Sequence, residues 1–414
     1  MKRKFKRISC AKKMTVLILV IAILLVSVMT GCSYNSAPKK VADKKKSINI
    51  GLCFDSFVIE RWLRERDTFV TAAKELGAKV NVQNANGDVK EQISQIDYLI
   101  SQNVDVIVII AVDCEAISDA VKRAKNKGIS VISYDRLIKN VDADLYISFD
   151  NETVGRDMGK AMKHALPHGG KIFEINGSSA DDNVIRVEKA FKQEISEAGI
   201  DIVYSDYCKG WSAKAAGEYV EKALEKYPDV DGIMCGNDDL ASEVARVLSE
   251  NRLSGKVALI GQDADLLACQ RIVEGTQKMT EFKKVEELAK TAAYFAVKIA
   301  KGEKYYKAGD SGQKKENDEK SSDYIATKKI DNGKSLVPYY SLKPVMVTKS
   351  NLDSIIIDSG FHTKEEVYLN VTKKKAPQMS GFKIICRKGE WHSHDTLSAV
   401  FRIFRRLCRG CAAG

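Results

Sequence analysis

Polar and aromatic side chains follow nearly every segment of this sequence that could form a β-strand. They combine carboxylates, amides and cations with two of the three tryptophans in the chain. In open parallel sheets, ligands bind outside the carboxyl ends of the strands, so we expect these side chains to converge on one cleft. Among the residues at these positions are Arg61, Trp62, Asp135, Arg136, Asp150, Asn151, Trp211, Asn237, Asp263 and Lys283.

These residue types suit a sugar. Each sugar hydroxyl both donates and accepts a hydrogen bond; carboxylate and Asn oxygens accept, while Arg and Lys donate. Hydrogen bonds to charged groups contribute about 1.5–3 kcal/mol each. The C–H faces of a pyranose stack on flat aromatic rings, a role open to Trp62 and Trp211. The combination predicts a monosaccharide ligand.

Each position also has a simpler interpretation. An Asp, Asn or Gly that follows a strand is often a helix N-cap or a turn residue. Arg61 and Trp62 could be a surface arginine and a core tryptophan, and Asp135 with Arg136 could form a surface ion pair. The joint pattern at successive strand ends favours the binding site over these separate interpretations.

Apolar strands and amphipathic helices alternate with short connections through residues 48–302. This pattern predicts parallel sheets with right-handed crossovers, and two such series predict an α/β fold of two doubly wound lobes. The expected strands are 48–54, 79–83, 104–111, 130–133, 145–148, 171–175, 201–205, 232–235, 257–260 and 278–282. The expected helices are 60–77, 89–103, 117–128, 154–166, 184–199, 213–227, 240–250, 266–275 and 285–302. Beyond them we expect a loop with a short strand at 324–326, an extended segment at 337–347 and a short helix at 350–360.

Length and charge agree with a two-lobed body. The chain has 414 residues. A single hydrophobic core rarely extends over a chain of this length, so two or more compact units are expected. Its formal charge is +11, but residues 2–13 contribute seven Lys/Arg and residues 373–414 a net +8, which leaves −4 for residues 14–372. The mildly acidic body lacks the excess of basic residues that is typical of nucleic-acid-binding proteins.

The N-terminus has the pattern of a lipoprotein signal peptide. A basic segment precedes an uncharged apolar run, 14–29, which as a helix would span about 24 Å, less than the ~30 Å hydrocarbon core. The run ends in Met29-Thr30-Gly31-Cys32, so we expect cleavage after residue 31, lipid on Cys32 and a flexible tether over 32–47. An uncleaved N-terminal anchor is the alternative. Both place the body on the extracytoplasmic side of the cell membrane.

The sequence gives no pattern for catalysis, a cofactor or a metal. It has no Ser-His-Asp series, no phosphate loop and no metal-spaced acidic cluster, and none of its five histidines follows a strand of the two series. Eight cysteines besides Cys10 and Cys32 are scattered, several of them in apolar strands, so we expect buried thiols rather than a disulfide framework. We therefore predict that the protein is not an enzyme.

Longer stretches resemble the bacterial D-xylose-binding proteins, in the pentose- and hexose-binding branch of the type I periplasmic-binding-protein superfamily. The resemblance covers about residues 47–370. It rests on ERWLRERDTFVTAAKELGAKVNVQNANGD, QISQIDYLI, VISYDRLI, YISFDNETVG, GNDDLAS, LSGKVALIGQDADLLACQRIVEGTQKMT and KPVMVTKSNL. One departure is Val58, where family members often carry a basic residue.

The resemblance implies two lobes joined by a three-strand hinge. The N-terminal lobe would hold 48–149 plus 284–338, and the C-terminal lobe 150–283 plus 339–371. Trp62 and Trp211 would be opposite stacking planes, and the chain would cross between the lobes at Asn151, at Lys283 and near 337–339. The remaining implied sugar contacts are Arg61, Asp135, Arg136, Asn237 and Asp263, with Asp150 beside the first crossing.

The implied function is a monomeric receptor that closes around D-xylose or a related monosaccharide. It would deliver the sugar to an ABC permease in the membrane. In the alternative, the closed protein reports the sugar to a membrane histidine kinase; neighbouring genes for a permease or for a kinase would separate the two. A LacI-type repressor, the third possibility, would need an N-terminal helix-turn-helix where this chain has a signal sequence.

The C-terminal stretch 372–414 departs from the family pattern. It is basic and holds Cys386, His392, His394, Cys408 and Cys411 at irregular spacing. A zinc site or a membrane-surface helix are alternatives there. We expect a disordered extension without a role in sugar binding.

Overall fold

Helices and strands alternate along the chain in the computed structural model, which describes residues 47–308 and 324–373. The first series is β1 (Ile48–Phe54), α2 (Glu60–Glu75), β2 (Ala78–Asn84), α3 (Val89–Ser101), β3 (Val106–Ile109), α4 (Ser118–Asn126), β4 (Ser130–Tyr134) and β5 (Leu145–Phe149). The second series begins with α5 (Asn151–Ala165), β6 (Gly170–Asn176), α6 (Asp182–Ile195), β7 (Ile200–Tyr207), the one-turn helix η1 (Lys209–Trp211) and α7 (Ala213–Lys226). It continues with β8 (Gly232–Cys235), α8 (Asp238–Glu250), β9 (Ala258–Ile260), α9 (Leu266–Glu274), β10 (Met279–Phe282) and α10 (Val285–Ala300).

Local sequence signals explain several of these boundaries. Asp88 caps α3 by accepting hydrogen bonds from the backbone N–H groups of Lys90 and Glu91. Asp181 caps α6 in the same way, through Asn183. Helix α9 ends at Gly275, whose φ of 90° lies in the left-handed region that glycine adopts without a steric penalty.

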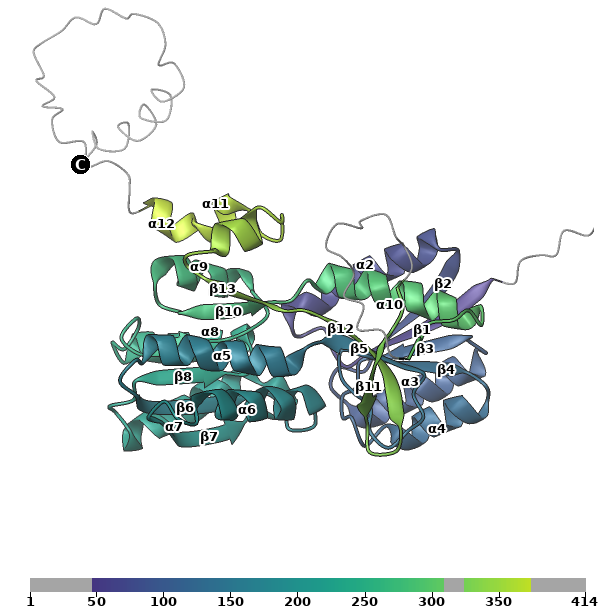
Figure 1. Cartoon of the computed structure of the whole chain (residues 1–414), viewed down its shortest axis with the longest axis horizontal. Helices are drawn as coiled ribbons and strands as arrows, with labels where there is room; N and C mark the ends of the chain where they lie inside the picture. Colours follow the sequence, from purple (N-terminus) through teal and green to yellow (C-terminus); the bar gives the residue numbers. More distant parts are fainter. Residues whose placement is uncertain (1–46, 309–323, 374–414) are drawn as a thin grey trace, which may run out of the picture. The chain divides into compact units, whose positions relative to one another are not determined.

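The first lobe is built on a seven-stranded sheet in the order β11-β12-β5-β4-β3-β1-β2 (Figure 1). All pairs are parallel except β11 (Lys328–Asp331) with β12 (Leu336–Leu342). Two hydrophobic clusters cover its faces. One contains α2 and α10 residues such as Phe69 and Phe295, and the other contains α3 and α4 residues such as Ile96 and Val121. Both faces are buried, as a doubly wound sheet requires.

The second lobe repeats this design on a six-stranded sheet in the order β13-β10-β9-β8-β6-β7 (Figure 1). Only β13 (Val345–Thr348) runs antiparallel to its neighbour, β10. Helices α5 and α6 contribute Met158 and Phe191 to the cluster on one face, while α7 and α8 contribute Val220 and Val244 to the cluster on the other. The predicted α/β fold of two doubly wound lobes is confirmed.

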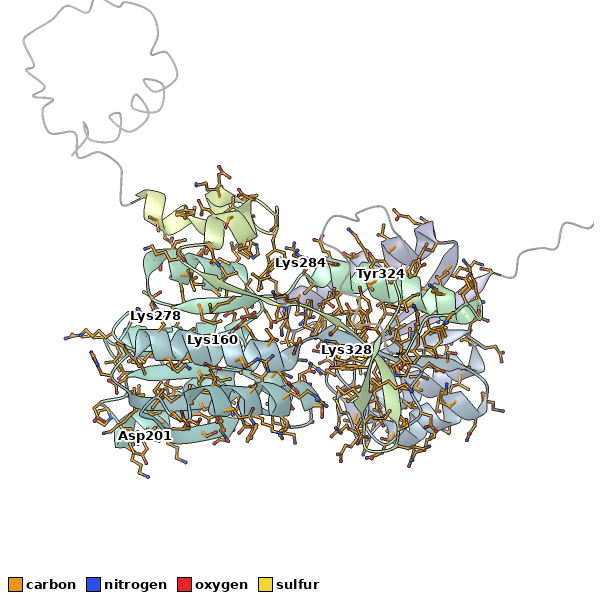
Figure 2. The ribbon with its side chains drawn as sticks, in the orientation of Figure 1. Lys160, Asp201, Lys278, Lys284, Tyr324 and Lys328 are labelled. Carbon is orange, nitrogen blue, oxygen red and sulfur yellow. The ribbon has the colours of Figure 1, made fainter. Side chains whose placement is uncertain are left out.

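The chain crosses between the sheets three times. It passes from β5 into α5, from β10 into α10 and from β12 into β13. Lys284, the N-cap of α10, marks the second crossing in Figure 2, where the chain returns to the lobe that also holds Tyr324 and Lys328. Lys160, Asp201 and Lys278 are labelled on the second lobe.

The third crossing lies at residues 343–344 and not near 337–339 as predicted. Tyr339 pairs with Tyr146, and the parallel pairing of β12 with β5 continues to Leu342 and Phe149. The chain therefore stays in the first sheet past residue 338, where the sequence placed the lobe boundary. The sequence missed β11 as well, because Lys328–Asp331 is a largely exposed polar edge strand that pairs, among the described strands, with β12 alone.

The remaining described elements are short. They are the helix η2 (Asp353–Ile357) and α11 (Lys364–Val367), and α12 (Leu369–Lys373) belongs to a separate unit. Across the described ranges, no helix combines the length and apolar character that a membrane span needs. The predicted signal peptide, Cys32, all but the end of the 32–47 tether and nearly all of the 372–414 tail lie outside the described residues.

The described cysteines are buried free thiols. Cys53, Cys114, Cys208, Cys235 and Cys269 form no disulfide, and burial raises the pKa of Cys53 to about 12. Cys53 and Cys114 belong to one core cluster and Cys208 and Cys235 to another, where they pack as small hydrophobic side chains, and Cys269 is buried as well.

Candidate ligand-binding cleft

A pocket of about 480 Å³, open in part to solvent, lies where the two lobes meet. Nine of the ten predicted site residues line it: Arg61, Trp62, Asp135, Arg136, Asn151, Trp211, Asn237, Asp263 and Lys283. They come from strand ends and helix starts of both lobes, as the parallel topology predicted.

Arg61, in the first turn of α2, is held on several sides. Its Nε donates to Glu65 at 2.6 Å and its Nη2 donates to Asp135 at 2.9 Å. Its Nη1 lies 3.6 Å from Oδ1 of Asp263, which belongs to the second lobe. The guanidinium carbon is 4.5 Å from the centre of the Trp62 ring. Arg61 is thus fixed before any ligand contributes a contact.

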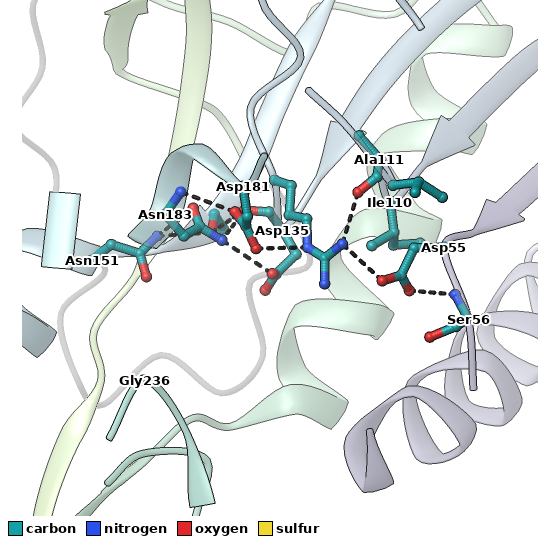
Figure 3. A network of polar contacts seen from close by, with 12 residues as sticks. Asp55, Ser56, Ile110, Ala111, Asp135, Asn151, Asp181, Asn183 and Gly236 are labelled. Carbon is teal, nitrogen blue, oxygen red and sulfur yellow. Dashed lines mark hydrogen bonds and ion pairs between the residues drawn. The ribbon is translucent and has the colours of Figure 1, made fainter. Parts of the chain in front are cut away.

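Arg136 forms a second network in the first lobe (Figure 3). Its Nη1 donates to Asp55 at 2.7 Å and to the carbonyl of Ala111 at 2.8 Å. Its Nε lies 2.8 Å from Oδ2 of Asp181 in the second lobe, so the cation joins carboxylates of both lobes. Burial raises the pKa of Asp181 to about 6, although the attraction of Arg136 opposes this.

Asp135 accepts a hydrogen bond from Arg61 and also feels the charge of Arg136. Burial alone would raise its pKa, but the cations of Arg61, Lys283 and Arg136 bring it below its ordinary value. Asp135 is therefore ionised at neutral pH. Its backbone carbonyl and Oδ1 also accept hydrogen bonds from Nδ2 of Asn183, at 3.1 and 3.3 Å (Figure 3).

The second lobe lines the cleft mainly with neutral amides. Asn176 ends β6, Asn237 caps α8 and Gln262 follows β9. All three are buried, yet Nδ2 of Asn176, Nδ2 of Asn237 and Oε1 of Gln262 make no hydrogen bond within the described part of the chain. Buried polar atoms are nearly always paired, so such atoms lining one pocket indicate a polar ligand.

Two tryptophans supply flat apolar surface in the pocket. Trp62 is buried and contacts Phe54 edge-on, with ring centroids 6.1 Å apart. Trp211 comes from the second lobe, yet packs against the core clusters of both lobes. A Cβ on Gly177 would lie 2.3 Å from Cη2 of Trp211, so only glycine lets this ring lie against the backbone there.

Three cleft residues hold a backbone conformation that side chains disfavour. Asp135, Trp211 and Asp263 have φ values of 62°, 58° and 103°. Non-glycine residues in such regions cost about 1–3 kcal/mol each and cluster at functional sites. At Asp135 the turn is held from both lobes, because its carbonyl accepts from the hydroxyl of Ser148 at 2.7 Å and from Asn183.

Asn151 and Lys283 lie at the first two crossings, as the resemblance implied. Nδ2 of Asn151 donates to Oδ1 of Asn183 at 2.8 Å (Figure 3). Nζ of Lys283 lies 3.1 Å from Oδ1 of Asp263. Both residues are buried and line the pocket, so hinge and ligand site share side chains.

Asp150 is the one predicted site residue that the structure does not bring to this pocket. Its side chain caps α5 by accepting from the backbone N–H of Thr153 at 3.1 Å. It lines a separate shallow pocket together with Arg186 and Lys328. Asp150 therefore acts as a helix N-cap in this structure and does not line the cleft. Val58, the departure from the family pattern, is exposed and does not line the cleft either.

Sequence reasoning missed four polar residues of the cleft: Asn176, Asp181, Asn183 and Gln262. Asn176 directly follows the expected strand 171–175, and Gln262 immediately precedes Asp263, so the strand-end rule could have found both. Asp181 and Asn183 lie at the start of α6 beyond a five-residue loop, where the same rule gives no position.

The lobes touch directly across the cleft. Besides Arg136 with Asp181, Nζ of Lys139 donates to Asp182 at 2.7 Å, and the N–H of Cys114 donates to the carbonyl of Ala180 at 3.1 Å. In residues 47–308 and 324–373, no group of three or more His, Cys, Asp and Glu side chains could hold a metal ion. The arrangement can bind a small polar ligand between two lobes, which defines the class of two-lobed binding proteins.

Comparison with known proteins gives the family. The family model described as "Periplasmic binding protein domain" matches residues 50–304, and this chain belongs to that family. It is 40% identical over 328 residues to the D-xylose-binding periplasmic protein of Haemophilus influenzae, covering 78% of this chain and 93% of the relative. It is 38% identical over 332 residues to the protein of the same name from Escherichia coli, covering 79% and 94%.

A solved structure supports the same assignment. An ABC transporter solute binding protein from Clostridium phytofermentans, with bound beta-D-glucose, superposes with a TM-score of 0.65 at 27% identity, covering 77% of this chain and 99% of that one. These relatives are binding proteins, so the prediction that the chain is not an enzyme is confirmed. Their periplasmic location agrees with an extracytoplasmic body.

Proposed function

We propose that this protein is an extracytoplasmic receptor that binds D-xylose, or a closely related monosaccharide, in the interlobe cleft and delivers it to an ABC permease. The observation that carries the proposal is the set of unpartnered amide atoms on Asn176, Asn237 and Gln262, which line one pocket with Trp62 and Trp211. A ring that carries hydroxyls at its edge and C–H groups on its faces complements both features.

The choice among sugars follows the relatives. Two relatives that align along 93% and 94% of their own length are named D-xylose-binding proteins. A pentopyranose has no exocyclic hydroxymethyl group, so the pocket must discriminate by one carbon and its hydroxyl. Such discrimination is strongest where buried polar groups of the wrong complex lack partners.

Ligand-dependent closure follows from the same unpartnered atoms. When the lobes are apart, water can solvate the amides of the second lobe. When they close without ligand, each buried unpaired atom costs about 1–3 kcal/mol. A sugar that supplies the missing hydrogen bonds removes this cost, so it favours the closed form by its contacts to the second lobe.

The cleft can be tested by calorimetric titration. The chain from residue 32 onward, with Cys32→Ala to keep it free of lipid, is titrated with xylose, ribose, arabinose, glucose and galactose. We expect saturable binding of xylose that Trp211→Ala abolishes and that Trp211→Phe, which keeps a smaller ring, partly restores. Binding of none of the five sugars to the unsubstituted cleft would contradict the proposal, as would full affinity in Trp211→Ala.

We propose in addition that lipid on Cys32 anchors the receptor to the membrane. The apolar run and the Met29-Thr30-Gly31-Cys32 pattern support this. Cells that express the full-length chain should hold it in the membrane fraction, and Cys32→Ala should release it or leave it with its signal uncleaved. Cleaved protein that stays soluble with Cys32 present would exclude the anchor.

A further inference from the structure

Glu65 lies behind the cleft, one helical turn from Arg61. It is 1% exposed, on the face of α2 that packs into the first lobe. Its Oε1 accepts from Nε of Arg61 at 2.6 Å, and its Oε2 accepts a short hydrogen bond from the hydroxyl of Tyr134. Glu65 does not line the pocket, so both carboxylate oxygens face protein groups.

The Glu65 contact determines which way the Arg61 guanidinium faces. An arginine carries five N–H donors in a rigid plane, so fixing Nε fixes the direction of the other four. With Nε on Glu65, Nη2 reaches Asp135 at 2.9 Å and Nη1 approaches Asp263 at 3.6 Å, both of which line the pocket. Arg61 itself lines the pocket beside these two carboxylates.

Glu65 also connects two elements that each carry a cleft residue. Tyr134 is the last residue of β4 and immediately precedes Asp135, whose φ is 62°. Through the Tyr134 hydroxyl, the start of α2 and the end of β4 share one carboxylate. A change at Glu65 therefore acts on Arg61 and on the backbone before Asp135 together.

We infer that Glu65 is a positioning residue for sugar binding: with Tyr134 it orients the Arg61 guanidinium toward the ligand without touching the ligand itself. The inference rests on the proposed function, because it requires that Arg61 contacts a ligand in this pocket. A purely structural role for Glu65 would change the stability of the first lobe but not the dependence of ligand affinity on pH.

Acidification supplies a way to weaken this contact without mutation. Burial raises the pKa of Glu65 to about 7, although Arg61 opposes the shift; Asp135 adds to it and the Tyr134 hydroxyl lowers it. Below neutral pH the carboxyl takes up a proton and loses its charge-assisted bond to Nε of Arg61. Affinity for sugar is therefore expected to fall as the pH decreases from 8.5 to 6.5. Burial raises the pKa of Asp181 to about 6 and that of Asp238, beside the cleft residue Asn237, to about 7, so both also titrate in or near this window, and the role of Glu65 is read from the difference that its substitution makes to the pH profile.

The experiment measures the sugar dissociation constant at pH 6.5, 7.5 and 8.5 for the chain from residue 32 with Cys32→Ala, and for Glu65→Gln in that background. We expect the reference protein to bind about fivefold more weakly at pH 6.5 than at 8.5, because a charge-assisted hydrogen bond is roughly twice as strong as a neutral one. Glu65→Gln should bind more weakly than the reference protein at pH 8.5, with a pH profile that is flatter than that of the reference protein because only Asp181 and Asp238 still titrate near this range.

Control variants separate the outcomes. Glu75→Gln, at an exposed position of the same helix, should keep the affinity and pH profile of the reference protein. If Glu65→Gln does not fold, Tyr134→Phe removes the second contact of Glu65 and should shift the pH midpoint of binding. A reference protein that binds no sugar refutes the proposed function. A reference protein that binds, with an unchanged pH profile in Glu65→Gln or Tyr134→Phe, overturns the positioning role.

Discussion

The two walls of the cleft differ in how their polar groups are satisfied. In the first lobe, Arg61 and Arg136 are charged and paired with buried carboxylates of their own lobe. In the second lobe, the amides of Asn176, Asn237 and Gln262 each keep one polar atom that no described protein group contacts. The charged groups of the first wall are therefore organised in advance, although Nε1 of Trp62 there also lacks a hydrogen bond, while the amides of the second wall are completed from outside.

This difference suits a protein that must close only when a ligand is present. A preorganised wall can capture a sugar from solution with little loss of side-chain freedom. An incomplete wall makes closure depend on the ligand, because its atoms lose water on closing and regain hydrogen bonds only from the ligand. If both walls were internally satisfied, the closed form would gain less from the sugar.

The largest expected effect comes from removing a cation of the first wall. Arg136→Ala leaves Asp55 and Asp181 buried without their partner, and breaking a buried ion pair in this way costs about 3–5 kcal/mol. Urea unfolding at pH 7.5 measures the loss. Arg123→Ala, which breaks an exposed pair with Asp97, should cost at most about 1 kcal/mol. Equal losses would mean that the first wall is not held by its buried charges.

A buried carboxyl outside the cleft tests whether unpartnered atoms in the second lobe are costly in general. Both oxygens of Glu281 in β10 lack a hydrogen bond among the described residues, and burial raises its pKa from 4.5 to about 9. The folded state then binds more protons than the unfolded state between these values, so the free energy of unfolding falls as pH rises through that window.

Glu281→Gln removes this titration. We expect the variant to be more stable than the wild type by about 2–3 kcal/mol at pH 8 and nearly equal to it at pH 5. Thermal unfolding at the two pH values measures the difference, with Glu225→Gln at an exposed position as the control. A variant that is less stable at pH 8 would show that Glu281 has a stabilising partner.

Steric fit at the second wall gives a smaller effect. Gly177→Ala places a Cβ 2.3 Å from the Trp211 ring, and such overpacking costs about 1–3 kcal/mol. The same substitution in a Trp211→Ala background should cost less than half as much, because the ring is gone. Denaturant unfolding of the four proteins completes the double-mutant cycle. If the losses in the free energy of unfolding from the two substitutions are additive, the strain of Gly177→Ala does not arise from contact with the Trp211 ring.

The smallest expected effect isolates one unpartnered donor. In Asn237→Asp the Oδ1 that caps α8, 2.9 Å from the N–H of Leu240, is kept while the Nδ2 donor is replaced. We expect sugar to bind about tenfold more weakly, or ~1.4 kcal/mol, and the melting temperature to fall as well, because the new carboxyl is buried beside Asp238. The exposed control Asn103→Asp should bind normally. Unchanged affinity in Asn237→Asp would mean that this amide does not face the ligand.

Adjacent residues show where sequence reasoning reached its limit in the cleft. Asp150 and Asn151 both follow β5, and both were predicted as site residues. The first turn of α5 points Asp150 to the N–H of Thr153 and Asn151 into the pocket. Residue type and position after a strand do not predict which of the two side chains enters the pocket. That depends on the direction in which the helix leaves the sheet.

The sequence by itself determined the alternation of strands and helices, the two lobes and most of the cleft. A nearly continuous apolar run such as 104–111, interrupted by Asp105, is typical of a parallel strand covered on both faces, and parallel strands bring their carboxyl ends to one edge. Arg61, Asp135, Asn237 and Asp263 could therefore be grouped although they are far apart along the chain.

Only the tertiary structure decided which of these groups are paired and which are left for a ligand. Glu65 is one of several charged residues on α2 in the sequence, and becomes the partner of Arg61 because that face of the helix packs inward. Arg136 meets Asp181 only because the lobes touch, and the third crossing follows the pairing of β12 with β5. Hydrophobic periodicity reports which face is buried, whereas hydrogen-bond partners between distant segments depend on how those segments pack.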